Sequence, residues 1–155
     1  MKFKTSEDVE APANVVFDAI TDFDGFERMV LRRGADVDRL HAPRHAPSIL
    51  SWDVTFKYRG KLRNVDVDLV RYVVPEGISI VAKSGNMSAD FLVDLVPLSK
   101  NHTRMIVSFD MKAKSLGAKL FVQSIKLARN TFNKKFAGRV ARFAREVERQ
   151  SGTRA

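Results

Sequence analysis

The sequence has 155 residues, of which 45% are hydrophobic and 29% charged, and its formal net charge is +9. This length and composition fit one soluble globular domain, and the absence of cysteine excludes disulfides and thiolate metal sites. No apolar run approaches the ~18 residues of a membrane-spanning helix, and the N-terminus turns acidic where a secretory signal would be apolar, so we expect a cytoplasmic protein.

The beginning of the chain predicts a strand followed by two short helices. Residues 2–10 alternate between apolar and polar side chains, as a strand does. Pro12 stands where the first turn of a helix tolerates proline, and the helix that it opens runs to Ile20. Residues 21–25 interrupt this helix, and a second short helix is expected at 26–33.

The middle of the chain predicts six more strands. A modest strand at 34–41 is followed by a loop at 41–47, whose two prolines exclude a continuous ladder. From Ser48 to Met111, apolar residues recur at every second position, which predicts five strands joined by short turns. Such strands pair as an antiparallel meander, with one face on the core and the other in water.

From Asp53 onward, the aspartates of these strands all fall on the polar parity. They are Asp53, Asp66, Asp68, Asp90, Asp94 and Asp110. The opposite parity is almost wholly apolar, so a cavity on that side has no carboxylate, cysteine or histidine in its predicted wall. General acid–base catalysis needs a titratable group within hydrogen-bond reach of the substrate. The pattern therefore favours a protein that is not an enzyme, and it leaves catalytic activity open.

One long helical pattern ends the chain, from Leu116 to about Arg149. Its apolar residues recur at spacings of three and four, which places them on one face. They are Phe121, Ile125, Ala128, Phe132, Phe136, Val140, Phe143 and Val147. At ~1.5 Å per residue this predicts a single helix about 50 Å long, whose stripe needs cover from the strands. Residues 1–150 then form one domain, and 151–155 are expected to be a disordered tail.

A curved antiparallel sheet wrapped on the long helix is the α+β arrangement that these parts favour. Residues 9–23, VEAPANVVFDAITDF, resemble the opening of the START/polyketide-cyclase (SRPBCC) superfamily, in which a strand ends in Ala-Pro and a helix carries Val-Phe. Residues 96–98 followed by Thr103-Arg104-Met105 are similar to its late hairpin. The resemblance implies the helix-grip fold, with about seven strands and a deep apolar cavity for lipids, quinones, sterols or polyketides.

The predicted cavity wall combines inward strand positions with residues of the long helix. The expected lining residues are Trp52, Val54, Phe56, Tyr58, Val67, Phe91, Val93, Val107, Phe109, Phe121, Ile125, Arg129 and Phe132. We expect Arg63, Thr103 and Arg139 at the cavity mouth, where an arginine can fork onto a carboxylate or phosphate. The histidines lie in predicted loops and turns, so we expect no metal site and no cofactor.

The positive charge is concentrated in the long helix. Residues 1–111 hold 15 basic and 16 acidic residues, whereas 112–155 hold 12 basic and 2 acidic ones. Three interpretations follow. The favoured one is binding of a small hydrophobic or amphipathic ligand in the cavity. The second is a polyketide cyclase or dehydratase, in which Tyr58, Arg63 or Arg129 polarises a carbonyl. The third is docking of the basic helix on an anionic membrane or RNA; the outer basic residues lack stacking aromatics, which argues against nucleic acid.

Overall fold

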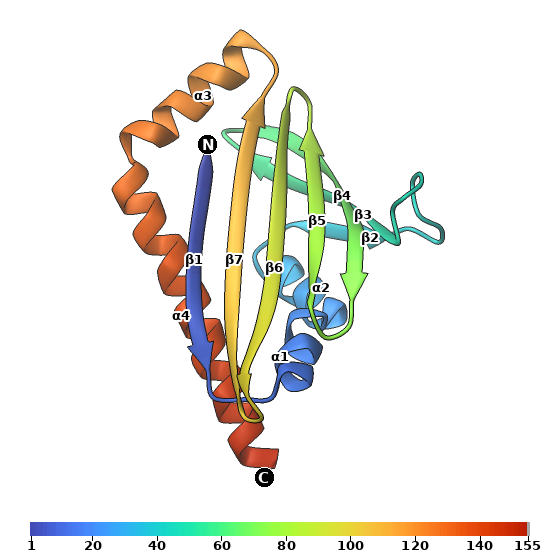
Figure 1. Cartoon of the computed structure of the whole chain (residues 1–155). Coiled ribbons are helices and arrows are strands. Elements are labelled where there is room, and N and C mark those ends of the chain that lie inside the picture. Colours follow the sequence, from blue (N-terminus) through green and yellow to red (C-terminus); the bar gives the residue numbers. More distant parts are fainter. Residues whose placement is uncertain (155) are drawn as a thin grey trace.

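The structure is a computed structural model that describes residues 1–154, with side chains for residues 1–152. Its elements follow the predicted order, except that the C-terminal helical region consists of two helices (Figure 1). They are β1 (Lys2–Val9), α1 (Ala13–Ile20), α2 (Phe23–Arg32), β2 (Asp36–Arg39), β3 (Leu50–Tyr58), β4 (Lys61–Val73), β5 (Gly77–Ser84), β6 (Met87–Ser99), β7 (His102–Ala113), α3 (Leu116–Leu127) and α4 (Arg129–Arg154).

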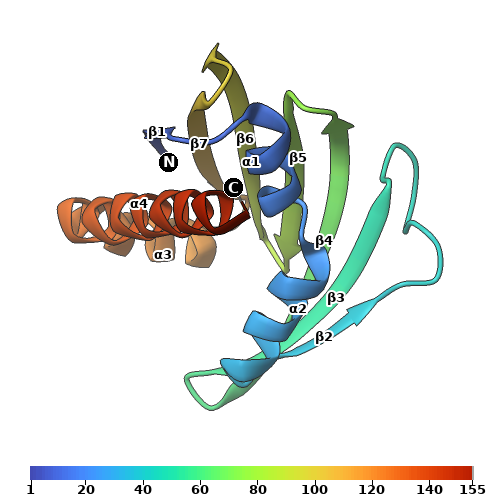
Figure 2. The same ribbon diagram turned by 90° about the horizontal axis from the view of Figure 1, so that it is seen from below.

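The strands form one seven-stranded antiparallel sheet in the order β1-β7-β6-β5-β4-β3-β2. The predicted meander from Ser48 onward is confirmed, because β3 to β7 are each joined to the next by a short turn. The first strand pairs with the last one, with Thr5 opposite Val107. The sheet curls, so that β1 and β2 lie on opposite arms around a concave face (Figure 2). This is the predicted α+β helix-grip fold.

Two short helices cover one end of the concave face. In α1, Val16, Phe17 and Ile20 are buried, and the Phe17 ring packs edge-on against Tyr72 with centroids 5.2 Å apart. Between the helices, the Asp22 carboxylate accepts a hydrogen bond of 3.1 Å from the Gly25 backbone N–H. This side-chain cap satisfies one of the free amides of the first turn, so α2 begins at Phe23 rather than at the predicted Phe26.

The predicted long C-terminal helix is present as α4, but it begins at Arg129 rather than at Leu116, because the helical region breaks at Ala128. This residue ends α3 with φ −102° and ψ 23°, and its N–H bonds to the Ile125 carbonyl in a tight turn. The sequence has neither glycine nor proline at this point. Helix α4 runs along β1, a strand of 8 residues that spans roughly 27 Å. Beyond the break, α3 packs against β7 instead of continuing along β1.

The C-terminal end of α4 also differs from the prediction, whereas the helical region begins at Leu116 as expected. Residues 151–154 continue α4 as helix, where a disordered tail was expected, and residue 155 of that tail lies outside the described residues. The half of the apolar stripe that lies on α4 does pack inward: Val147 is buried, and Phe136, Val140 and Phe143 pack against the core.

None of the helices in residues 1–154 is long and apolar enough to cross a membrane.

Candidate functional site

An open groove of about 880 Å³ lies between the concave face of the sheet, α2 and α4. Its floor consists of inward side chains from β3 to β7, which the period of two places on one face. Some of them are directly opposite on neighbouring strands: Ile80 faces Phe91, and Val93 faces Val107. The groove exists because α4 packs along β1, at the edge of the sheet, and does not cover its centre.

Aromatic side chains of α2 bridge the sheet and α4. Phe23 at the start of α2 lies 5.4 Å from Trp52, measured between ring centroids. One turn later, the ring of Phe26 stacks on Phe143 of α4, with centroids 6.3 Å apart and planes inclined by 28°. Both Phe26 and Phe143 line the groove, so this pair narrows its opening without closing it.

The rim of the groove carries five charged side chains with different surroundings. Glu27 forms an ion pair with Arg39, and Glu146 forms one with Arg149. Hydrogen bonding to Arg149 lowers the pKa of the Glu146 carboxyl below its ordinary value. The other rim residues are Arg33, Arg139 and Arg142. Within the described part of the chain, the guanidinium groups of these three arginines have no ion-pair or hydrogen-bond partner. They therefore remain available to an anion.

The structure brings together part of the predicted cavity wall. The predicted residues that line the groove are Trp52, Val54, Val67, Phe91, Val93 and Val107. All six come from inward strand positions. Arg139, which the sequence placed at the mouth, lies at the rim.

The other predicted site residues lie outside the groove. They are Phe56, Tyr58, Phe109, Phe121, Ile125, Arg129 and Phe132 of the expected wall, and Arg63 and Thr103 of the expected mouth. Their strand parity was right in several cases. Parity, however, does not tell how far along a strand the groove extends.

Four of these residues are engaged elsewhere. Phe109 and Phe132 pack on the Phe3 ring, at centroid distances of 6.5 and 4.8 Å, and fill the space between β1, β7 and α4. Arg129 lies 5.7 Å over the same ring and donates to the Lys2 carbonyl at 3.3 Å. Thr103 is fully buried, and its hydroxyl donates to the Ala11 carbonyl at 2.8 Å.

The remaining residues lie at the ends of elements that extend past the groove. Tyr58 and Arg63 are exposed near the hairpin that joins β3 to β4, where the Arg59 guanidinium lies 5.4 Å from the Tyr58 ring. Phe121 and Ile125 belong to α3, beyond the break.

Sequence reasoning missed the contribution of α2 to the groove. The lining residues from this helix include Phe23, Phe26, Met29 and Val30. Phe23, Phe26 and Val30 recur at helical spacing, and this signal could have identified an apolar face. Also missed were Ile78, Ile80 and Met105 of the floor and Arg142 of the rim.

The six strand aspartates point away from the groove, as predicted, and none of them lines it. Several are paired with cations on the outer face: Asp90 with Lys112 at 3.4 Å and Asp94 with Arg71 at 3.1 Å. Asp68 was expected in water and is instead buried, because Arg44 from the loop before β3 covers it.

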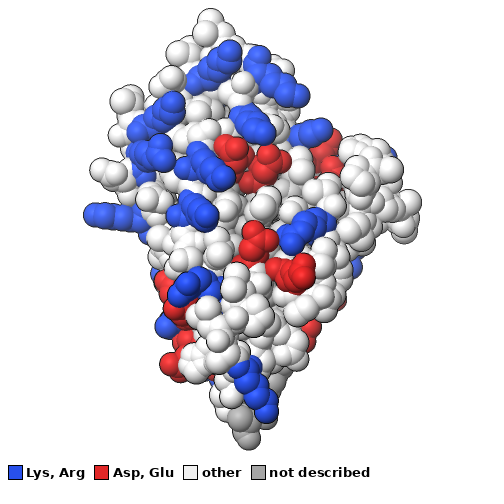
Figure 3. Space-filling model, in the orientation of Figure 1, with Lys and Arg blue, Asp and Glu red and all other residues white. Residues whose placement is uncertain are grey.

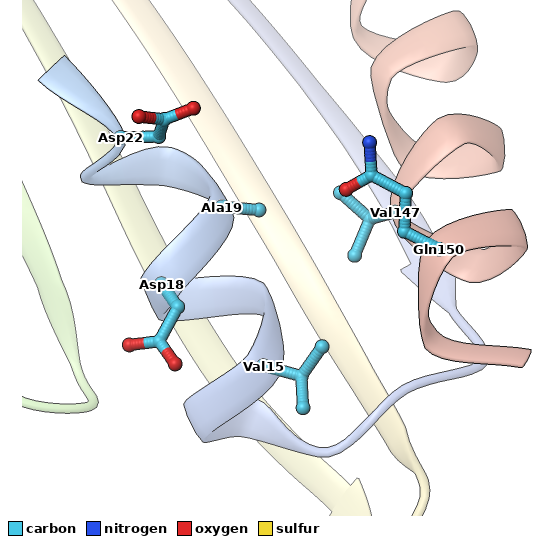
Figure 4. A pocket seen from close by; sticks show the side chains of 6 residues that line it. All are labelled: Val15, Asp18, Ala19, Asp22, Val147 and Gln150. Atoms are coloured by element: carbon cyan, nitrogen blue, oxygen red, sulfur yellow. The ribbon is translucent and has the colours of Figure 1, made fainter. Parts of the chain in front are cut away.

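A second, smaller hollow of about 240 Å³ separates α1 from the end of α4 (Figure 4). Ala19 and Val15 of α1 point toward Val147 across it. The carboxylates of Asp18 and Asp22 point in different directions and do not converge on one position. This hollow therefore offers neither an apolar wall of useful size nor a set of convergent polar groups.

The fold is found in solved structures of very different sequence. No family model matches the chain, and no curated protein matches it. The protein TTHA0849 from Thermus thermophilus is similar over 97% of this chain and 99% of its own, with a TM-score of 0.65 and 11% identity. The ZhuI aromatase/cyclase from Streptomyces sp. R1128 is similar over 97% of this chain and 94% of its own, with a TM-score of 0.62 and 13% identity.

A START superfamily protein from Mycobacterium smegmatis is similar over 86% of this chain and 95% of its own, with a TM-score of 0.52 and 13% identity. At these identities the likeness concerns the fold alone. The chain thus shares the helix-grip fold of these solved structures.

Proposed function

We propose that this protein, with its helix-grip fold, binds a small amphipathic ligand whose apolar body lies in the groove and whose acidic group meets the arginine rim. The observation that carries the proposal is the open groove of about 880 Å³ with an apolar floor. This volume falls in the range of roughly 300–1,000 Å³ that small-molecule sites occupy. Apolar surface in such a groove gains free energy when a ligand displaces its water.

The rim supports an acidic group on the ligand. Arg139 and Arg142 are three residues apart on α4, so they project from neighbouring positions on one side of the helix. The carboxylates on the same rim are already neutralised by Arg39 and Arg149. An arginine fork matches the two oxygens of a carboxylate or the oxygens of a phosphate.

Titration with 11-(dansylamino)undecanoic acid tests this proposal. We expect saturable binding, with a blue shift of the dansyl emission and energy transfer from Trp52, which is the only tryptophan and lines the groove. The double variant Arg139→Gln/Arg142→Gln should weaken binding of the acid at least about tenfold, since the loss of even one charged hydrogen bond costs about 1.5 kcal/mol or more. Binding of the methyl ester should change little.

The matched control is Lys134→Gln/Lys135→Gln, which removes the same charge from exposed positions of α4 outside the groove. This variant should bind the acid as the wild type does. Failure of the wild type to bind either probe saturably would contradict the proposal. Equal losses of affinity for the acid in both double variants would mean that the arginines act only through general electrostatic attraction.

The cyclase interpretation finds less support in the same geometry. Tyr58, Arg63 and Arg129 were the groups expected to polarise a carbonyl, and all of them lie outside the groove. Apart from the buried Trp52 indole N–H, which has no hydrogen-bond partner in the described structure, the polar side chains among the described lining residues are rim arginines and paired glutamates. Such a set supports recognition of an anion better than it supports proton transfer.

A further inference from the structure

Helix α3 presents a row of leucines to solvent. The exposed fraction is 76% for Leu116, 62% for Leu120 and 93% for Leu127. With 3.6 residues per turn, these side chains lie within about 40° of one another around the helix axis. They therefore form one apolar row, which we call the leucine row.

The leucine row is not needed to attach α3 to the rest of the protein. Ala118, Val122 and Ile125 lie on the other side of the helix and are half-buried, and α3 packs against β7 and α4. No residue of α3 is fully buried. The helix is thus apolar on both sides, and its exposed side has the character of an interaction surface.

The surroundings of the leucine row are strongly basic. Lys119 and Lys126 border it on one side, and among the described residues the ammonium group of neither lysine has an ion-pair or hydrogen-bond partner. From residue 111 to residue 145 the chain holds ten basic residues and no acidic one. Figure 3 shows Lys and Arg side chains gathered in the upper part of the molecule, over α3, the first half of α4 and the neighbouring end of β1.

The geometry points to a bilayer that contains anionic lipids as the partner of this surface. We propose that α3 lies in the plane of such a bilayer, with the leucine row inserted at the boundary between headgroups and acyl chains and the lysines at the lipid phosphates. Leucines bordered by lysines are the pattern of interfacial helices. Acidic lipids attract each lysine near the surface, which adds to the burial of the leucines.

Two other partners fit the surface less well. In a two-fold dimer the same patch meets itself, so the lysines that flank the leucine row would face lysines. Single-stranded RNA binds on stacked aromatic side chains, whereas the row consists of leucines. The proposal does not depend on the groove, because none of the α3 residues lines it.

Sedimentation with vesicles of phosphatidylcholine alone, and of phosphatidylcholine with phosphatidylglycerol, tests the proposal on the full chain. We expect binding to the mixed vesicles only. Leu120→Ser/Leu127→Ser should reduce the partition coefficient at least about tenfold through lost apolar burial, and Lys119→Glu/Lys126→Glu should abolish binding. The controls are Leu98→Ser and Lys100→Glu, exposed positions near the β6–β7 turn at the opposite end of the molecule (Figure 1). They should bind as the wild type does.

Insertion can be measured directly, because the chain has no cysteine and a single introduced one is a unique labelling site. Leu127→Cys carrying an NBD fluorophore should shift its emission to the blue with the mixed vesicles, whereas the same label at Leu98→Cys should not. Absence of vesicle binding, or binding that survives both α3 double variants, would overturn the proposal. A dimer that the leucine variants dissociate, or RNA binding that they abolish, would also overturn it. Unchanged binding of the dansyl probe to these variants would show that membrane binding through α3 is independent of ligand binding in the groove.

Discussion

Asp68 is almost completely buried on the convex side of the sheet, with 3% of its surface exposed. Its Oδ1 atom accepts hydrogen bonds from Arg44 Nη1 at 2.7 Å and from the Ser51 hydroxyl at 2.6 Å. Burial alone would lower the pKa of Arg44, but the hydrogen bond to Asp53 and the charges of Asp68 and Asp66 raise it above its ordinary value. Arg44 thus forms ion pairs with all three carboxylates and offsets part of their negative charge, which fits a contribution to stability.

Two serines near this cluster provide a matched test of its hydrogen bonds. The Ser51 hydroxyl donates to Asp68 and accepts from the Arg44 backbone N–H at 2.9 Å, so Ser51→Ala should lower the free energy of unfolding by about 1–3 kcal/mol. The Ser48 hydroxyl is buried and has no hydrogen-bond partner in the described structure. Ser48→Ala should therefore change the free energy by less than about 0.5 kcal/mol, or stabilise the protein. Urea denaturation of both variants measures the difference, and equal losses would contradict the assignment.

Among the elements, the strands could be predicted from the sequence, whereas the break in the C-terminal helical region could not. The period of two from Leu50 to Met111 determines both the strands and the side that faces the core. The break at Ala128 has no such signal, because the spacing of apolar residues continues across it and no glycine or proline marks it. Only the assembled fold shows it, because α4 packs along β1 whereas α3 packs against β7.

The groove followed only in part from the sequence for a related reason. Trp52, Val67 and Phe91 were identified by parity on single strands, and the structure brings them together. Phe109 has the same signal and Phe132 has the corresponding helical spacing, but Phe3 from the other end of the chain fills the space beside them. Whether an inward apolar residue lines a groove or packs in the core depends on contacts between distant elements.

The sheet offers a position at which the groove can be filled from within. Ile80 on β5 is half-buried and lines the groove, so a larger side chain has room to extend into it. We expect Ile80→Trp to abolish binding of the dansyl probe while lowering the free energy of unfolding by less than the about 1–3 kcal/mol typical of overpacking. Leu92→Trp, on the opposite face of neighbouring β6, should leave binding intact. Probe titration and urea denaturation measure the two effects.

At one edge of the sheet β1 pairs with β7, and an ion pair joins these two strands. Asp8 and Arg104 are opposite each other in the register, and Arg104 Nε donates to Asp8 Oδ1 at 2.8 Å. This hydrogen bond, reinforced by the arginine charge, lowers the pKa of the Asp8 carboxyl below its ordinary value, although slight desolvation opposes it. The folded state therefore favours the ionised form of Asp8.

The sign of the resulting pH dependence follows from that direction. A carboxyl whose pKa is lower in the folded state stabilises the protein above its ordinary pKa, and this contribution is lost as the pH falls through the folded-state value. Arg104→Gln should raise the Asp8 pKa, and its stability difference from the wild type should be present at neutral pH and disappear in acid. Carboxyl titration by NMR measures the pKa. Arg28→Gln, on exposed α2, should leave Asp8 unchanged, and a similar shift in both variants would contradict the assignment.

The pairing of β1 with β7 also has a consequence during synthesis. The first strand emerges from the ribosome long before residues 102–113, which form β7, the strand that it pairs with in the sheet. At translation rates of about 5–20 residues per second, β1 waits for several seconds with its backbone unpaired. The nascent chain can assemble β3 to β6 in that interval, but the first strand and the helix that lies along it must join the fold last.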